Sequence, residues 1–173
     1  MYRLTMVALA LVSASGLRAQ TPVSNSLRFL AGRASNNLVG SAQEMPAEKY
    51  GFKPTPAQMS FAEVVLHVAD DTDAMCGSIS DVTAPAAAKL VPTDPKDKLV
   101  ARLKQSFDFC TAALAKVDDS KLGDSIPFFG ERKLTRASVM FIQISDWADH
   151  YSQLAIYLRL NGLLPPTAKK KQG

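Results

Sequence analysis

Two histidines and one aspartate in apolar helical stretches are the residues best suited to chemistry. Asp146 and His150 are four positions apart in a helical pattern, so both project from one face of that helix. His67, the other of the chain's two histidines, lies in a second helical stretch. Imidazole nitrogens and a carboxylate oxygen suit zinc, nickel or ferrous iron, and three such ligands leave coordination positions open. The pattern predicts one divalent metal ion held between two helices.

The same residues also allow an interpretation without metal. Asp146 and His150 could form a hydrogen bond within their helix, and His67 could pair with Glu63 or Asp71, each four residues away. Three carboxylates are alternatives to Asp146 as the oxygen ligand: Asp70, Asp71 and Asp149. Asp149 is the weaker choice beside His150, because adjacent helical residues point about 100° apart. Neither a nucleophile elbow nor a phosphate-binding glycine loop occurs in the sequence, so the catalytic residues stay unknown.

The closing motif of the chain carries a family resemblance. It runs His150-Tyr151-x-Gln153-Leu154 and continues, over residues 157–166, as Tyr-Leu-Arg-Leu-x-Gly-Leu-x-Pro-Pro. This motif resembles the DinB superfamily of four-helix bundles, whose usual metal ligands are a histidine on the second helix and a His-x-x-x-His pair on the fourth. The resemblance implies His67 and His150 as ligands, and Asp146 stands where the first histidine of the pair is usual. It also implies thiol-dependent transferases or metal-dependent hydrolases as activities, and homodimers as a common assembly.

Helical periodicity defines the elements that must position these residues. Apolar residues recur at three- and four-residue intervals in four stretches, which prolines and glycines separate. The predicted helices span residues 24–44, 61–79, 95–117 and 135–162. The segment 118–133 is predicted as a long loop or a short hairpin over one end. We therefore expect an all-α fold, a four-helix bundle with long irregular loops.

Local signals mark where these helices begin and end. Ser60 and Glu63 have the spacing of a capping box before the second helix. Asp94, followed by Pro95, is the predicted N-cap of the third helix. Thr135 is the predicted N-cap of the fourth helix, and residue 162 is a glycine of the kind that follows a helix end.

The N-terminal residues have the order of a secretory signal peptide. Arg3 precedes an apolar stretch over residues 4–12, and small residues then lead to Ala19. Cleavage near Ala19 predicts one exported domain, residues 20–166, in the periplasm or outside the cell, with a basic disordered tail over residues 167–173. The apolar stretch is shorter than the roughly 20 residues that span a bilayer, so no transmembrane segment is expected.

The two cysteines fall in neighbouring predicted helices. Cys76 lies late in the second helix and Cys110 in the middle of the third. An exported chain meets an oxidising compartment, so we expect a disulfide between them. Two buried, unpaired thiols are the alternative.

Charge and composition limit the choice of partners. The formal net charge of +4 falls by two if Arg3 and Arg18 leave with the signal peptide, and so small an excess does not predict nucleic-acid binding. The lysine run 169–171 is typical of a solvated terminus. Trp147 is interpreted as core packing. The rival function is a non-catalytic, metal-free bundle that binds a protein or an unidentified small molecule.

Overall fold

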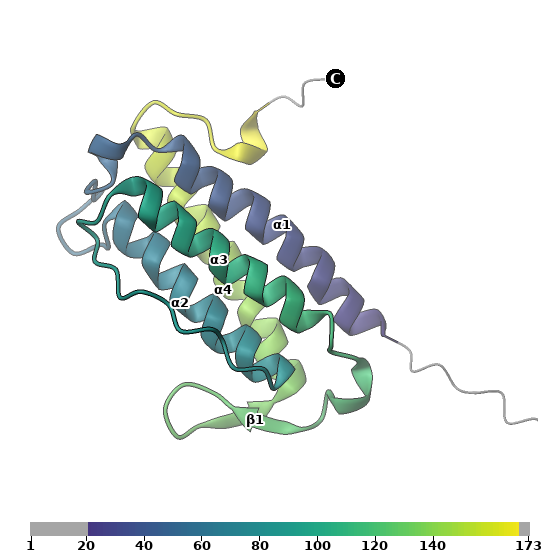
Figure 1. The fold of residues 1–173 in the computed structure, drawn as a ribbon. Helices are drawn as coiled ribbons and strands as arrows, with labels where there is room; N and C mark the ends of the chain where they lie inside the picture. The colour runs from purple at the N-terminus through teal and green to yellow at the C-terminus, as the bar shows by residue number, and fades with distance from the viewer. Residues whose placement is uncertain (1–20, 170–173) are drawn as a thin grey trace, which may run out of the picture.

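Four long helices lie side by side in the computed structural model, which describes residues 21–169 (Figure 1). In chain order they are α1 (Pro22–Glu44), α2 (Phe61–Ser80), α3 (Lys96–Leu114) and α4 (Arg136–Leu160). Three short 3-10 turns join or follow them: η1 (Ala47–Lys49), η2 (Asp119–Lys121) and η3 (Pro166–Ala168). The prediction of an all-α four-helix bundle is confirmed. The predicted signal peptide, residues 1–19, lies outside the described residues.

The bundle core is built from the apolar stripes that the helical periodicity predicts. Leu99, Leu103, Phe107 and Leu114 of α3 are buried, and they meet buried side chains of α1 and α2 in one cluster. Val117, predicted as the last member of this stripe, lies beyond the end of α3 and is only half-buried. Each fully buried large apolar side chain stabilises the fold by about 1.5–3 kcal/mol relative to exposure. Within the described residues, no helix is long and apolar enough to cross a membrane.

The predicted capping box fixes the start of α2. The Ser60 hydroxyl accepts from the Glu63 amide at 3.2 Å, and the Glu63 carboxylate accepts from the Ser60 amide at 2.5 Å. These bonds from Ser60, together with Lys53, lower the pKa of Glu63 to about 2. Because two otherwise unpaired donors are satisfied here, the register of α2 is defined from its first turn.

The prediction for the start of α3 is wrong by one residue. Pro95, and not Asp94, is the N-cap residue, and α3 begins at Lys96 without a side-chain cap. The Asp94 carboxylate instead accepts from the Val91 amide at 2.8 Å, which closes a turn before the helix. Lys96 then donates to the carbonyl oxygen of Met45 at 2.7 Å, so the start of α3 is tied to the end of α1.

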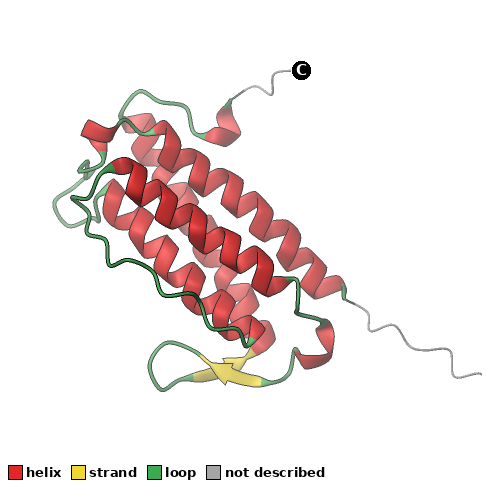
Figure 2. Cartoon of the chain, in the orientation of Figure 1, coloured by secondary structure: helices red, strands yellow, loops and turns green. Residues whose placement is uncertain are grey.

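A small hairpin covers one end of the bundle (Figure 2). Its strands, β1 (Ser125–Pro127) and β2 (Lys133–Thr135), pair antiparallel, with Ile126 opposite Leu134. This is the hairpin alternative predicted for residues 118–133. It leads directly into α4, whose predicted N-cap is confirmed because the Thr135 hydroxyl accepts from the Ser138 amide at 3.2 Å.

The far end of α4 is closed by a glycine turn. Gly162 has a φ of 74°, its amide donates to Arg159 at 3.0 Å, and the Leu163 amide donates to Leu158 at 3.0 Å. This pattern is the Schellman motif, which requires a left-handed residue and so favours glycine. The chain then continues to a turn in which Thr167 bonds the Tyr151 hydroxyl at 2.6 Å. Packed structure therefore continues past residue 166.

The start of α1 is capped by a residue far away in sequence. Thr21, at the N-cap position, makes no side-chain capping bond. The carboxylate of Asp119 in η2 accepts from the amides of Val23 and Ser24 at 2.9 and 2.8 Å, and from the Ser24 hydroxyl at 2.5 Å. A negative charge at a helix N-terminus is favourable, because the free amides there carry partial positive charge.

Two contacts join the opposite ends of α2 and α4. Arg136, the first residue of α4, is buried. At the end of α2, its guanidinium donates to the carbonyl oxygen of Ile79 and to the Asp81 carboxylate, the second bond being 2.9 Å long. Tyr157, near the end of α4, donates from its hydroxyl to the carbonyl oxygen of Met59 at 2.8 Å, just before α2 begins. We call these two contacts the end clamps. The seam between α2 and α4 is thus held at both ends.

The two cysteines form the expected disulfide between α2 and α3. Cys76 and Cys110 are fully buried, and their Cα atoms are 5.2 Å apart. The bond closes a loop across 34 positions of sequence. Such a closure restricts the unfolded chain far more than the folded one.

Reduction should therefore destabilise the protein. We expect thiol titration under denaturing conditions to find no free thiol until reductant is added, and reduction to cost roughly 2–4 kcal/mol of unfolding free energy. Denaturant unfolding with and without reductant measures the difference. A Cys76→Ala/Cys110→Ala variant is the control, since its stability should not respond to reductant. Two titratable thiols in the untreated protein would contradict the bond.

Candidate metal centre

The structure brings together the three side chains that the sequence singles out. His67 projects from the middle of α2, and Asp146 and His150 project from the middle of α4. One donor atom from each of the three residues lies within 4.8 Å of the others. The two imidazole rings meet edge to face, with centroids 4.7 Å apart and planes at 83°. These three residues, called the seam triad below, therefore lie midway between the end clamps.

Each histidine of the seam also faces a carboxylate on its own helix. His150 Nε2 lies 3.4 Å from Asp146 Oδ1, and His67 Nε2 lies 3.3 Å from Asp71 Oδ2. Both distances are long for a charge-assisted hydrogen bond of about 2.7–2.9 Å. Of the two pairings open to His67, the structure contains the one with Asp71, because Glu63 is engaged by the capping box and by Lys53 at 3.1 Å.

Asp146 contains an unsatisfied polar atom. Its side chain is 17% exposed, and its Oδ2 atom is buried without a hydrogen-bond partner among residues 21–169. A buried carboxylate oxygen is costly unless it is hydrogen-bonded, paired or bound to a cation. Two imidazoles and one carboxylate are also the donor types that zinc, nickel and ferrous iron accept. The residues present therefore fit a divalent metal ion.

A chain of hydrogen bonds orients the His150 ring. The Tyr157 hydroxyl donates to the Met59 carbonyl, so its oxygen is left to accept from Gln153 Nε2 at 3.0 Å. This fixes the Gln153 amide with its Oε1 atom 3.1 Å from His150 Nδ1. Because an amide oxygen only accepts, Nδ1 carries a proton in this arrangement, and in the neutral ring Nε2 keeps its lone pair for a metal.

Burial and neighbouring charges set the electrostatics of the seam. The His150 side chain is 14% exposed, whereas that of His67 is 40% exposed and forms the open side. The Asp146 carboxylate raises the pKa of His150 above its ordinary value, although burial acts in the opposite direction. Burial raises the pKa of Asp71, and the two histidines offset part of this effect. In the metal-free seam, both effects favour protonated side chains.

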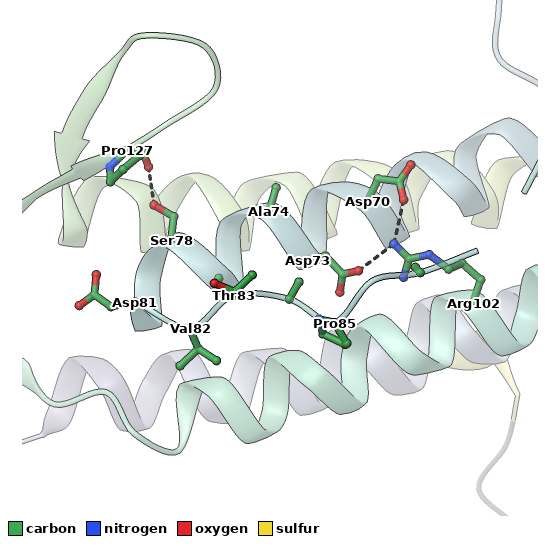
Figure 3. Close-up of a pocket in the computed structure, with 13 residues that line it drawn as sticks. Asp70, Asp73, Ala74, Ser78, Asp81, Val82, Thr83, Pro85, Arg102 and Pro127 are labelled. Carbon is green, nitrogen blue, oxygen red and sulfur yellow. Dashed lines mark hydrogen bonds and ion pairs between the residues drawn. The ribbon is translucent and has the colours of Figure 1, made fainter. Parts of the chain in front are cut away.

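Two of the alternative carboxylates are engaged elsewhere or exposed. Asp70 points to α3, where Arg102 donates to it at 2.8 Å and pairs with Asp73 at 2.8 Å (Figure 3). These residues line an open pocket of about 620 Å³ on another face of α2. Asp149 is exposed. Neither Asp70 nor Asp149 is therefore a candidate ligand.

Sequence reasoning placed some residues correctly and overlooked the roles of others. Trp147 is core, as predicted, and its indole N–H donates to the Thr72 hydroxyl at 3.0 Å. Gln153 and Tyr157 were visible in the closing motif without a role. Their spacing, three and seven residues after His150, is the available signal, because it places both next to that ring on the helix surface.

Comparison with known proteins settles the family. The sequence profile of the DinB superfamily matches residues 31–154. The chain belongs to the DinB superfamily. Its DinB fold is shared by solved structures of low sequence identity. No curated protein matches the sequence significantly.

Three of these solved structures illustrate the shared DinB fold. A DinB-like protein from Bacillus subtilis has a TM-score of 0.68 and 20% identity, over 86% of this chain and 100% of that one. A DinB-like protein from Bacillus cereus has a TM-score of 0.67 and 14% identity, over 86% and 97%. A conserved protein from Enterococcus faecalis has a TM-score of 0.64 and 17% identity, over 80% and 96%.

The electrostatics of this DinB protein predict how His150 titrates. Asp146→Asn should lower the His150 pKa in metal-free protein, because the Asp146 carboxylate is the largest cause of its elevation. The elevation stabilises the fold fully below about pH 6.5, and the effect is lost as pH rises through the raised pKa. Proton NMR can follow the two imidazoles, with a His67 variant for assignment. Asp149→Asn is the control, and an equal effect of both variants would contradict this explanation.

The hydrogen-bond chain predicts the tautomer of His150. In metal-free protein above the His150 pKa, nitrogen NMR should find the proton on Nδ1. Gln153→Leu keeps much of the side-chain volume but removes the acceptor, so the Nδ1 preference should weaken. Ser152→Ala, at the neighbouring exposed position, should leave it unchanged. A ring protonated mainly on Nε2 in the wild type would show that Gln153 does not orient it.

Proposed function

We propose that this DinB protein binds one divalent metal ion through His67, Asp146 and His150. The observation that carries the proposal is the unpartnered, buried Asp146 Oδ2 in a group whose three donor atoms lie within 4.8 Å of one another. A divalent cation would satisfy this oxygen and take the lone pairs of two imidazoles. Gln153 supports the same role, because it leaves Nε2 of His150 free.

The donor set favours zinc or nickel, with ferrous iron as a further option. Imidazole suits all three ions, and two histidines with one carboxylate occur as ligands of both catalytic zinc and non-haem iron. Exchanging a histidine of the usual family set for Asp146 adds a negative charge to the site. That charge lowers the cost of holding a doubly charged ion in a half-buried seam.

Hydrolysis is the reaction class that we favour if the protein is an enzyme. When bound, the ion would act as a Lewis acid that polarises water or activates a thiol. His67 forms the open side of the seam, which gives a small molecule access. Thiol transfer is the other class that family membership suggests, but low-molecular-weight thiols are scarce outside the cytoplasm. A metal-free binding module is the alternative function.

We also propose that the domain, which begins at residue 20, acts after export and removal of residues 1–19, in the periplasm or outside the cell. The Cys76–Cys110 disulfide supports this location, because such bonds persist in oxidising compartments. A homodimer is proposed through α1 and α4. Exposed Phe29 and Phe141 on these helices support it, since large apolar side chains are enriched where proteins associate.

Elemental analysis of the protein, purified without a histidine tag or chelator, tests the metal proposal. We expect about one equivalent of zinc, nickel or iron per chain. Asp146→Ala and His150→Ala should lose most of it, because each removes a ligand, while circular dichroism should show that the bundle remains folded. Asp149→Ala removes a neighbouring exposed carboxylate and should keep the metal. Metal-free wild-type protein that also fails to bind added zinc, nickel or ferrous iron would refute the proposal.

A further inference from the structure

Asp71 is a further carboxylate beside the seam triad, and the triad leaves it without a function. Its Oδ2 atom lies 3.3 Å from His67 Nε2, and its side chain is only 18% exposed. On α4, Asp146 and His150 make the corresponding contact at 3.4 Å. Each helix therefore contributes one histidine and one aspartate at the same four-residue spacing, and Asp71 lies beside the seam triad through its contact with His67.

The length of these contacts is compatible with a shared cation. A direct bond between charged imidazole and carboxylate is about 2.7–2.9 Å long, shorter than either contact. Two donors bound to one tetrahedral ion, at bond lengths of about 2.0–2.1 Å, lie about 3.3–3.4 Å apart. Both His–Asp distances match that separation. Asp71 lies outside the group of donors that are all within 4.8 Å of one another, so its carboxylate must turn toward the triad to reach a shared ion.

The charges of the seam agree with this interpretation. Asp71 and Asp146 repel one another when both are ionised, and this repulsion contributes to the raised pKa of Asp71. Two carboxylates, two neutral imidazoles and one divalent cation together carry no net charge. Asp70, the neighbouring carboxylate, points toward Arg102 of α3, which pairs with it at 2.8 Å (Figure 3). Asp71 is thus the carboxylate of α2 that a cation in this seam would compensate.

We propose that Asp71 is a fourth protein ligand of the metal ion, so that α2 and α4 each supply one histidine and one aspartate. This inference depends on the proposed metal binding by the seam triad. Four protein donors are typical of structural zinc sites, whereas catalytic sites keep a position for water or substrate. Asp71 therefore closes the site, and a reaction at the ion requires this carboxylate to move away.

Metal affinity of Asp71→Asn tests the proposal, with Asp70→Asn as the matched control. Both variants remove one negative charge from adjacent positions of α2, but only the first removes a donor from the seam. Titration of metal-free protein with zinc should show that Asp71→Asn lowers the zinc affinity more than about tenfold. Mutation of a residue that only hydrogen-bonds a metal ligand already costs about tenfold, and loss of a ligand should cost more. Asp70→Asn should bind within about threefold of wild type, because it changes only the surrounding charge.

Cobalt(II) spectra give a second readout that does not depend on activity. Four-coordinate cobalt absorbs visible light much more strongly than five- or six-coordinate cobalt. Wild-type protein and Asp70→Asn should show the strong bands, and Asp71→Asn should show weaker ones because water takes the vacated position. Circular dichroism and the unfolding midpoint of the metal-free variants establish that the bundle is intact.

The possible results separate this inference from the proposed function. If wild-type protein binds none of zinc, cobalt, nickel and ferrous iron, the metal proposal itself is wrong. If it binds one equivalent and Asp71→Asn matches it in affinity and spectrum, the seam triad stands and Asp71 is not a ligand. Equal weakening in Asp71→Asn and Asp70→Asn would show that Asp71 acts through its charge alone, which also overturns ligation.

Discussion

The fixed position of α2 against α4 is the constraint on which the candidate metal centre depends. One histidine comes from α2, and its partners come from α4, so a slip of one helix turn would separate them by about 5.4 Å. The end clamps oppose such a slip from both sides. Arg136 holds the end of α2, and Tyr157 holds the backbone before its start. The disulfide separately ties α2 to α3.

These restraints hold polar side chains together at a half-buried place where apolar side chains would make the folded state more stable. Imidazoles and carboxylates in a half-buried seam lose hydration, and Asp146 Oδ2 gains no hydrogen bond in return. Packing and hydrogen bonds elsewhere in the bundle offset this unfavourable free energy and keep the donor atoms close to one another. A ligand that binds a preformed group avoids most of the entropy cost of ordering side chains. Tyr157 serves both purposes, since its hydroxyl clamps the helices and also orients Gln153 beside His150.

The parts of this structure that could be predicted from the sequence are those determined by residues close together in the chain. Helical periodicity located the four helices. The capping box and Thr135 identified two helix starts correctly, because each signal joins residues only three positions apart. The prediction of Asp94 as a cap was wrong, because its carboxylate accepts a hydrogen bond from the Val91 amide instead. The placement of Asp146 and His150 on one face of a helix was likewise predictable from their spacing. The Arg136 clamp and the contact of Tyr157 with Met59 were not, because they join residues 57 and 98 positions apart.

The remote cap on α1 makes the order of synthesis matter. Two amides and a hydroxyl in the first turn of this helix share one partner, Asp119, whose carboxylate is 96 positions from Val23. That partner does not exist until most of the chain has been made. Until then, the beginning of the helix has no side-chain cap of its own. The first helix of the bundle to emerge, which begins a few residues after the predicted cleavage point at Ala19, is thus completed only after the third helix has been made.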